Sequence, residues 1–271
     1  IDIEQDAQGR ISGGKLKVDG KAVEYGGMGT MSKSKMNGVD PQAIINEYGA
    51  DTARLFMMFT SPPEQSLEWS DEGVVGAFRF LKRLWRMAFE HVEQGVVARY
   101  VGGELNAEQK ALRFELHRTI QKVADDYGRR QQFNTAIAAV MELLNHLSKL
   151  ADKSPTSRAV AQEVLENTAL MLSPIVPHVC EALWRTLKPG SAKLIDAAWP
   201  TVDGAALIQD EIELVVQVNG KLRGNMTVAK GATREAIETL ARNHPNIEKF
   251  VAGQTIKKII VVPGRLVNVV V

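Results

Sequence analysis

The run GTMSKSKMNGVDP, residues 29–41, combines small residues with side chains that could bind phosphate. Lys33 offers a point positive charge, and the serines beside it offer hydroxyl donors to phosphate oxygens. Small residues would let such a loop close over a triphosphate at a transition state. Catalysis would then stabilise the charge that moves onto a departing pyrophosphate, without a covalent role for the protein. A mobile phosphate-binding loop is therefore one interpretation of this run.

Two other interpretations are a solvated Ser/Lys/Gly loop and a P-loop. The segment GMGTMSKS at 27–34 fits the P-loop pattern except that Ser32 replaces its second glycine. A P-loop opens directly into a helix whose N-terminus binds the phosphates. Here residues 37–40 intervene, the next helix is expected to start at Pro41, and no clear acidic strand for Mg²⁺ follows. The context disfavours the P-loop and leaves the other two interpretations open.

Short elements are expected on both sides of the loop. Asp19-Gly20 predicts a hairpin between short alternating strands. Residues 40–60 predict two short helices, the first capped by Asp40 and ended by Gly49, the second capped by Asp51. The chain begins with Ile, and a lone hairpin has too little apolar face to be stable. We therefore expect the chain to begin in the middle of a larger fold.

Residues 71–195 predict a helical bundle, because successive segments place apolar residues at three- and four-residue spacing. A helix over 72–94 would bury Val75, Phe78, Leu81, Trp85, Ala88 and Val92. The next helix starts at Asn106, with Gln109 as its capping-box partner, and carries the stripe Leu112, Leu116, Ile120, Val123 and Tyr127. Further helices are expected over about 132–150, 156–172 and 177–187. His178 and Cys180 near Pro177 are interpreted as packed bundle residues rather than metal ligands.

A linker over 196–210 separates the bundle from a segment in which the apolar period changes to two. Asn219-Gly220 is the strongest short hairpin signal of the chain, and Leu222, Met226 and Val228 continue the alternation on the return strand. Two helices over 233–242 and 246–251 precede two more strands around Pro263-Gly264. The predicted fold class is thus mainly α, a helical bundle, with a small C-terminal α/β domain of order ββααββ.

Composition excludes several classes of protein. The chain has 271 residues, of which 45% are hydrophobic and 24% charged, and its net charge is +1. The N-terminus does not resemble a signal peptide, and no run of 18 apolar residues predicts a membrane span. We expect a cytoplasmic protein that does not act at a membrane. Its single cysteine, Cys180, excludes an internal disulfide and a cysteine-based zinc site, and no bound metal is expected.

Several motifs together resemble one family. Met31-Ser32-Lys33-Ser34 resembles the K-M-S-K-S signature of class I aminoacyl-tRNA synthetases, and KMNGVDPQAIINEYGADTARLFMM at 35–58 is similar to the segment that follows it. The segments FNTAIAAVMELLN and LSPIVPHVCEALW resemble the helical bundle of the leucyl, valyl, isoleucyl and methionyl subgroup. The segments VVQVNGKLRG and VVPGRLVNVV resemble the small C-terminal domain of bacterial leucyl-tRNA synthetase. Because neither a long coiled coil nor a cysteine-rich module ends the chain, the leucyl enzyme is the best match.

This resemblance implies the ATP-dependent attachment of leucine to tRNA(Leu). It makes Met31, Ser32, Lys33 and Ser34 the ATP-binding segment and Lys33 the catalytic residue, with ATP and Mg²⁺ as substrate. Thr30 stands where the signature has its first lysine, which places in doubt any role that needs two lysines. It further implies that 1–28 ends an inserted β-rich module and that 29–70 joins the loop to the catalytic core. On the same basis 71–195 is an anticodon-binding-type bundle and 211–271 a small tRNA-binding domain.

The family's H-x-G-H motif is missing, since none of the five histidines begins it: His91, His117, His146, His178, His244. We expect the nucleotide-binding half, the leucine pocket and the editing domain to lie upstream, so that leucine would be reached only through that missing half. An alternative to a part of an enzyme is a free-standing, non-catalytic tRNA-binding module descended from one. The intact loop favours the enzyme, and Thr30 slightly favours the module.

Basic residues suggest where tRNA would bind. Four of them fall at i, i+3, i+4 and i+7 on the 72–94 helix, and a row of cations suits a phosphate backbone. Others lie on the strands of the C-terminal domain. A solvated basic face is the alternative interpretation in both places. The candidates are Arg79, Lys82, Arg83, Arg86, Lys221, Arg223, Lys257, Lys258 and Arg265.

Overall fold

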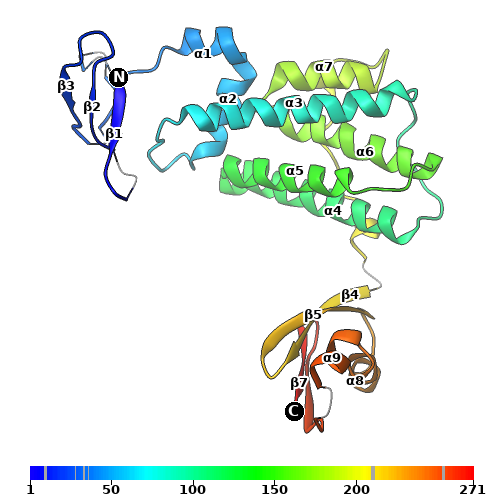
Figure 1. Cartoon of the computed structure of the whole chain (residues 1–271). Coiled ribbons are helices and arrows are strands. Elements are labelled where there is room, and N and C mark those ends of the chain that lie inside the picture. Colours follow the sequence, from blue (N-terminus) through cyan, green and yellow to red (C-terminus); the bar gives the residue numbers. More distant parts are fainter. Residues whose placement is uncertain (9–10, 28, 33, 36, 209–210, 252–253) are drawn as a thin grey trace. The chain divides into compact units, whose positions relative to one another are not determined.

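A computed structural model describes residues 1–8, 11–27, 29–32, 34–35, 37–208, 211–251 and 254–271. The chain divides into two compact units, Ile1–Glu47 and Tyr48–Val271. Helices dominate the middle of the sequence, and small sheets form near both of its ends (Figure 1). The predicted predominance of helices, accompanied by some sheet, is confirmed.

The first unit contains a small antiparallel sheet of order β1-β2-β3. Its strands are β1 (Asp2–Gln5), β2 (Ile11–Lys15) and β3 (Ala22–Glu24). The predicted hairpin joins β2 to β3: Gly20 adopts a φ of 72°, and Asp19 Oδ1 accepts the Lys21 N–H at 3.1 Å. Most side chains of this sheet are exposed, so it holds little core of its own.

The helices α1 (Pro41–Tyr48) and α2 (Ala50–Thr60) follow the loop. Asp40 caps α1 as predicted, because its Oδ1 accepts the Gln42 N–H at 3.0 Å. The predicted cap of α2 is wrong: Gly49, with a φ of 86°, occupies the N-cap position. Asp51 instead lies inside the first turn of α2, where it is buried.

The bundle uses long helices that match the predicted ones to within two residues at nearly every end. They are α3 (Asp71–Glu93), α4 (Ala107–Asp125), α5 (Phe133–Ser148), α6 (Pro155–Leu172) and α7 (Pro177–Leu187). Figure 1 shows them running alongside one another, and α2 packs on α3 and α5. Their facing sides bury an apolar core that includes Leu55, Leu84, Leu116, Ile120, Ile137, Leu144 and Leu172.

The predicted apolar stripe of α3 is partly wrong. Leu81 and Ala88 are buried as expected, but Trp85 remains 43% exposed, and Val75, Phe78 and Val92 are only half-buried. The core is instead completed from the neighbouring positions Val74, Ala77, Phe80 and Leu84. The helix carries more apolar residues than one face can hold, so spacing alone did not decide which of them face inward.

Local signals fix the start and end of α4. The capping box is present as predicted: Asn106 Oδ1 accepts the Gln109 N–H at 2.9 Å, and Gln109 Oε1 accepts the Asn106 N–H at 2.8 Å. At its other end α4 continues into a π-helical turn, η1 (Asp126–Arg130), that stops at Gln131 with a φ of 53°. The predicted stripe of α4 lies in the core, with Tyr127 half-buried in the π turn.

The segment between bundle and C-terminal sheet contains two 3₁₀ turns, η2 (Leu194–Asp196) and η3 (Gly204–Leu207). Asp203, which begins η3, bonds to α4 in two ways. Its carboxylate accepts from Arg113 Nη2 at 2.9 Å, and its backbone N–H donates to His117 Nδ1 at 3.1 Å. Part of the predicted linker is therefore bound to the bundle.

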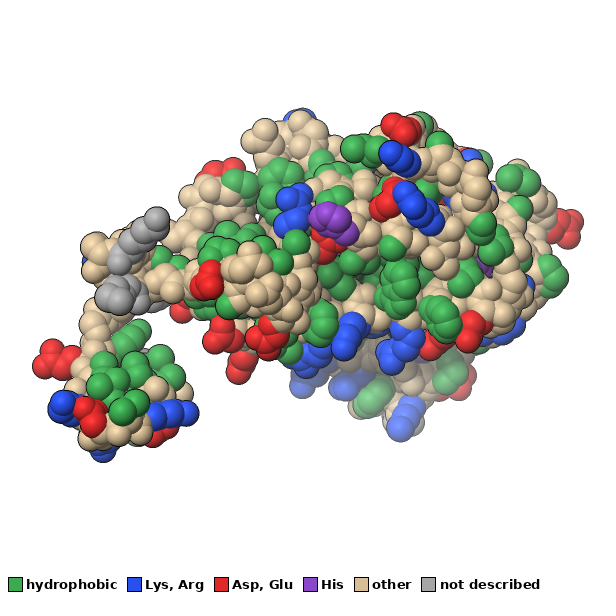
Figure 2. Space-filling model, turned by 90° about the horizontal axis from the view of Figure 1, so that it is seen from above, with side chains coloured by type: hydrophobic (Ala, Val, Ile, Leu, Met, Phe, Trp, Pro, Cys, Tyr) green, Lys and Arg blue, Asp and Glu red, His purple; other side chains and the backbone are tan. Residues whose placement is uncertain are grey.

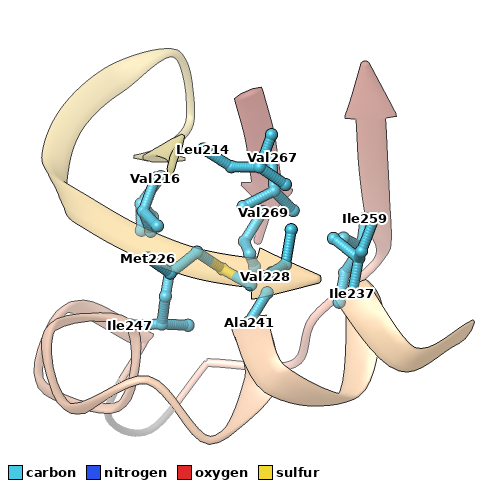
Figure 3. Close-up of a cluster of buried hydrophobic side chains, with 11 residues drawn as sticks. Leu214, Val216, Met226, Val228, Ile237, Ala241, Ile247, Ile259, Val267 and Val269 are labelled. Atoms are coloured by element: carbon cyan, nitrogen blue, oxygen red, sulfur yellow. The ribbon is translucent and has the colours of Figure 1, made fainter. Parts of the chain in front are cut away.

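The C-terminal part forms a four-stranded sheet of order β5-β4-β7-β6. Its elements are β4 (Glu211–Val218), β5 (Lys221–Ala229), α8 (Arg234–Arg242), α9 (Pro245–Val251), β6 (Lys258–Val262) and β7 (Leu266–Val270). The two central strands, β4 and β7, are parallel, and the outer pairs are antiparallel. Figure 3 shows Ile237 and Ala241 of α8 and Ile247 of α9 facing Val216, Met226, Val228 and Val269 of the sheet.

The predicted alternation on the return strand is broken at Leu222. Met226 and Val228 face the helices, but Leu222 is 66% exposed. The cause is a register shift: Val216 pairs with Gly224 and the next residue, Gln217, pairs with Leu222, so Arg223 is an extra residue in β5. One extra residue reverses the direction of the side chains beyond it.

Over the described part of the chain, no helix is long and apolar enough to cross a bilayer.

Candidate functional site

The phosphate-loop candidate is closed by the side chain of Asn37. Its Oδ1 accepts the Ser32 N–H at 2.9 Å, and its Nδ2 donates to the Thr30 carbonyl at 3.3 Å. Within the loop, Ser32 Oγ accepts the Lys35 N–H at 3.2 Å and lies 3.2 Å from Ser34 Oγ. These bonds join the described residues of the loop, which precedes α1.

Three of the four predicted ATP-binding residues lie within the described part of the loop. Met31 and Ser34 are exposed and Ser32 is half-buried. Lys33, the predicted catalytic residue, lies outside the described residues. Its role stays a prediction from the sequence.

The four basic candidates lie on one continuous helix, α3, but their surroundings differ. Arg79 and Arg83 border a cavity of about 730 Å³ that Met141 of α5 also lines. Lys82 borders a different cavity, next to α7. Arg83 is held by Asn145, whose Oδ1 accepts from its Nη1 at 3.0 Å. Arg86 is exposed and makes only a loose contact, 4.0 Å, with Glu90.

In Figure 2 the basic side chains on the visible face lie interspersed with hydrophobic and acidic ones. No single basic patch stands out on that face.

The basic candidates of the C-terminal sheet separate into three places. Lys221 follows the β4–β5 turn, and Lys258 pairs with Val270, so these two and Lys257 share one end of the sheet. Arg265 lies at the opposite end, where its carbonyl accepts the Val215 N–H at 3.1 Å. Arg223 covers the ring of Phe250 in α9, with Cζ 3.9 Å from the ring centroid.

Lys221 and Lys258 lie on the two outer strands. With three strand spacings of roughly 4.8 Å between them, they stand about 14 Å apart. Lys221, Lys257 and Lys258 are exposed, whereas Arg223 covers the ring of Phe250.

Sequence reasoning missed a polar pair at the start of α2 and α7. Asp51 Oδ1 lies 2.8 Å from His178 Nδ1, and Asp51 Oδ2 accepts the Val179 N–H at 2.7 Å. The prediction that His178 is packed is wrong, because 78% of its side chain is exposed. The prediction for Cys180 is confirmed, and burial raises the pKa of its thiol. No local signal could reveal this pair, since its members lie 127 positions apart.

A second missed cluster lies inside the bundle. Arg113 of α4 donates to both carboxylate oxygens of Glu163 in α6, at 2.8 and 3.2 Å. His117 Nε2 lies 3.4 Å from the same carboxylate. Burial alone would raise the pKa of Glu163, but the bonds from His117 and Arg113 outweigh it and hold this pKa below its usual value. The cluster joins α4, α6 and the segment at Asp203. Arg113, His117 and Glu163 are buried, which suits a structural rather than a chemical role.

The described residues include no group of three or more His, Cys, Asp or Glu side chains placed to hold a metal ion.

Comparison with known proteins relates segments of this chain to two protein families. Residues 22–70 match the family described as "tRNA synthetases class I (I, L, M and V)", and residues 109–239 match the "Anticodon-binding domain of tRNA ligase". Leucine–tRNA ligase of Chromobacterium violaceum is 67% identical over 99% of this chain, and that of Laribacter hongkongensis is 64% identical over 99%. The chain covers 31% and 30% of these two relatives, so it spans about a third of their length.

A solved structure gives the same picture. The crystal structure of a ternary complex of Agrobacterium radiobacter K84 LeuRS with tRNA and LeuAMS matches 89% of this chain and 31% of its own. The TM-score is 0.70 and the sequence identity 27%. The resemblance stated from the motifs is confirmed: over nearly its whole length the chain is homologous to the C-terminal part of leucine–tRNA ligases.

Proposed function

We propose that this chain supplies the ATP-phosphate loop and the tRNA-binding domains of a leucyl-tRNA synthetase, which attaches leucine to tRNA(Leu) with ATP. The observation that carries the proposal is the match of nearly the whole chain to leucine–tRNA ligases at 67% identity. ATP with Mg²⁺ is the phosphate substrate, and leucine binds in the part of the enzyme that this chain does not contain.

In this proposal Lys33 acts on the phosphates of ATP while the pyrophosphate departs. Asn37 supports a defined loop, because its side chain bonds to the Ser32 N–H and to the Thr30 carbonyl. The work of the loop is electrostatic and needs no covalent step. Lys35 supplies further positive charge where Thr30 replaces the signature's first lysine.

The tRNA would contact the bundle through Arg79, Lys82 and Arg86, and the C-terminal domain through Lys221, Lys257 and Lys258. These side chains are exposed and suit phosphate oxygens. Three further predicted residues are weaker candidates. Asn145 accepts a hydrogen bond from Arg83, and Arg223 covers the ring of Phe250. Arg265 lies at the opposite end of the sheet from Lys221, Lys257 and Lys258.

Binding of labelled tRNA(Leu) to the purified chain tests the RNA part. Binding that weakens steeply as salt rises, with a slope reduced by about 1 in Lys258→Ala, is the expected result. Lys230→Ala, an exposed lysine beyond the end of β5, is the matched control. Absence of binding at low salt would contradict the proposal.

Leucine-dependent exchange of pyrophosphate into ATP tests the loop. The chain is mixed with the separately expressed N-terminal part of a related ligase, and activity is expected only in the mixture. Lys33→Ala should abolish it, whereas Lys17→Ala, an exposed lysine near the β2–β3 turn, should not. Silence in a mixture whose parts associate would instead support a non-catalytic tRNA-binding module.

A further inference from the structure

A cavity of about 460 Å³ opens where the first turns of α2 and α7 meet the middle of α3. Its volume lies in the range of small-ligand sites. Its wall is largely apolar, and Phe78 and Trp85 of α3 supply aromatic surface. Phe78 is fixed in place, since its ring packs edge-on against Tyr48 with the centroids 5.5 Å apart. Trp85 is 43% exposed and offers part of its surface to solvent.

Lys82 and His178 border the same cavity. Lys82 lies between the two aromatic residues in sequence, with Nζ 4.6 Å from the centroid of the Phe78 ring. His178 lies across from α3 at the start of α7 and is largely exposed. Because a carboxylate only accepts hydrogen bonds, His178 Nδ1–H donates to Asp51 Oδ1 at 2.8 Å. The ring is thereby oriented, and its Nε2 is available to a ligand.

The charge of the cavity favours an anion. Asp51 is the only carboxylate among the described residues that line it. That carboxylate is 5% exposed, and both of its oxygens are engaged, one by His178 and one by the Val179 N–H. A ligand entering the cavity therefore meets Lys82 and His178 rather than an accessible negative charge.

We propose that this cavity binds one unpaired nucleotide of the tRNA, with its base against Trp85, its phosphate near Lys82 and one of its hydrogen-bond donors at the Nε2 of His178. The inference rests on the proposed function and adds to it a specific RNA contact. Aromatic surface interleaved with cations is the chemistry of single-stranded nucleic-acid sites, because every base has a face that stacks. An apolar protein segment could use the aromatic wall, but it would leave the charge of Lys82 without a counter-charge in the cavity.

The affinity of tRNA(Leu) for the full chain, measured by fluorescence anisotropy, tests this proposal. Trp85→Ala should weaken binding by about 5- to 150-fold, the range expected for one stacked base. Trp85→Phe should retain most of the affinity. Phe89→Ala is the matched control, since Phe89 lies on α3 with 49% exposure and does not line the cavity.

The phosphate contact has its own variants. Lys82→Ala should lower the salt slope by about 1, whereas Lys110→Ala, an exposed lysine of α4, should not affect binding through this cavity. The double variant His178→Ala/Trp85→Ala should lose less binding free energy than the sum of the two single variants, because both side chains contact one nucleotide.

Tryptophan emission distinguishes the possible occupants. The difference between the wild-type and Trp85→Phe emission isolates Trp85, and tRNA(Leu) should quench it. Suppose that Trp85→Ala binds tRNA as well as the wild type does, and that tRNA leaves the Trp85 emission of the wild type unchanged. The cavity proposal then fails and the proposed function stands. If the N-terminal part of a related ligase changes the Trp85 emission and tRNA does not, the occupant is protein, which also overturns it. If the wild type binds no tRNA, the proposed function itself fails.

Discussion

Arg113 and Glu163 form a two-pronged ion pair inside the helical bundle, with Nε 2.8 Å from Oε2 and Nη2 3.2 Å from Oε1. Their side chains are 10% and 8% exposed. Arg113 Nη2 also reaches the carboxylate of Asp203 at 2.9 Å. One side chain of α4 thus binds α6 and the segment that leads to the C-terminal sheet.

Removal of Arg113 should destabilise the bundle strongly. Arg113→Ala leaves the buried Glu163 carboxylate with His117 but without its two bonds to Arg113, and breaking a buried ion pair costs about 3–5 kcal/mol. Urea unfolding of the two proteins measures this difference. Arg118→Ala is the control, because Arg118 pairs with Glu115 on the exposed side of α4 and should change the free energy of unfolding by less than about 1 kcal/mol. Equal effects of the two substitutions would refute the assignment.

The attachment of η3 to the bundle should depend on Asp203. In Asp203→Ala the carboxylate no longer accepts from Arg113 and from the Ala205 N–H, so the turn at 204–207 should open more often. Hydrogen exchange by mass spectrometry should show faster exchange at 203–208. Exchange at 194–197, in the other 3₁₀ turn, is the internal control and should stay unchanged. Unaltered protection at 203–208 would show that apolar packing holds the turn.

The register shift in β5 predicts unequal effects for two apolar residues of one strand. Leu222→Ala should change the free energy of unfolding by less than about 0.5 kcal/mol, since the side chain lies in solvent. Val228→Ala should cost about 1.5–3 kcal/mol, because it removes two buried methyl groups and leaves a cavity. Chemical denaturation compares the two. A larger cost for Leu222→Ala would mean that the strand pairs without the extra residue.

These contrasts show which features sequence patterns could predict. Asp40, Asn106 with Gln109, and the hairpin turns act on residues a few positions away, so their types and spacing were sufficient. Leu222 was misplaced because a bulge depends on the partner strand. Asp51 looked like a cap of its own helix, yet its bonds run to α7, 127 residues away in the case of His178.

The candidate site was predictable to a similar extent. The loop motif and the lysines of the C-terminal domain could be found from residue types alone. The division of the α3 cations between two cavities depends on which residues of the other helices face them. The pair Arg113 and Glu163, 50 positions apart, left no local pattern at all.

Acidification should weaken the bundle through His91. Gln162 Nε2 donates to Glu166 and to the Leu187 carbonyl, so Gln162 Oε1 accepts from His91 Nε2 at 2.9 Å. Burial lowers the pKa of His91, and the positive charges of Arg158 and Lys153 lower it further.

A lowered pKa fixes the sign of the effect. Below about pH 6.5, the ordinary value, the unfolded chain binds more protons at this site than the folded one. The stabilisation is complete above that pH and is lost as pH falls through the folded-state pKa. Urea unfolding between pH 8 and pH 5.5 should show a decline that is shallower in His91→Gln, which keeps a donor to Gln162 but does not titrate. Identical profiles would exclude His91 as the source.

A chimera tests the central claim most directly. This chain replaces the matching C-terminal part of the Chromobacterium violaceum leucine–tRNA ligase, to which it is 67% identical, and leucylation of tRNA(Leu) is measured. The ligase lacking that part is the negative control. The account predicts that the chimera charges tRNA(Leu) and that Lys33→Ala abolishes charging. A folded chimera that binds tRNA(Leu) but leaves it uncharged, or one that charges equally well with Lys33→Ala, would contradict it.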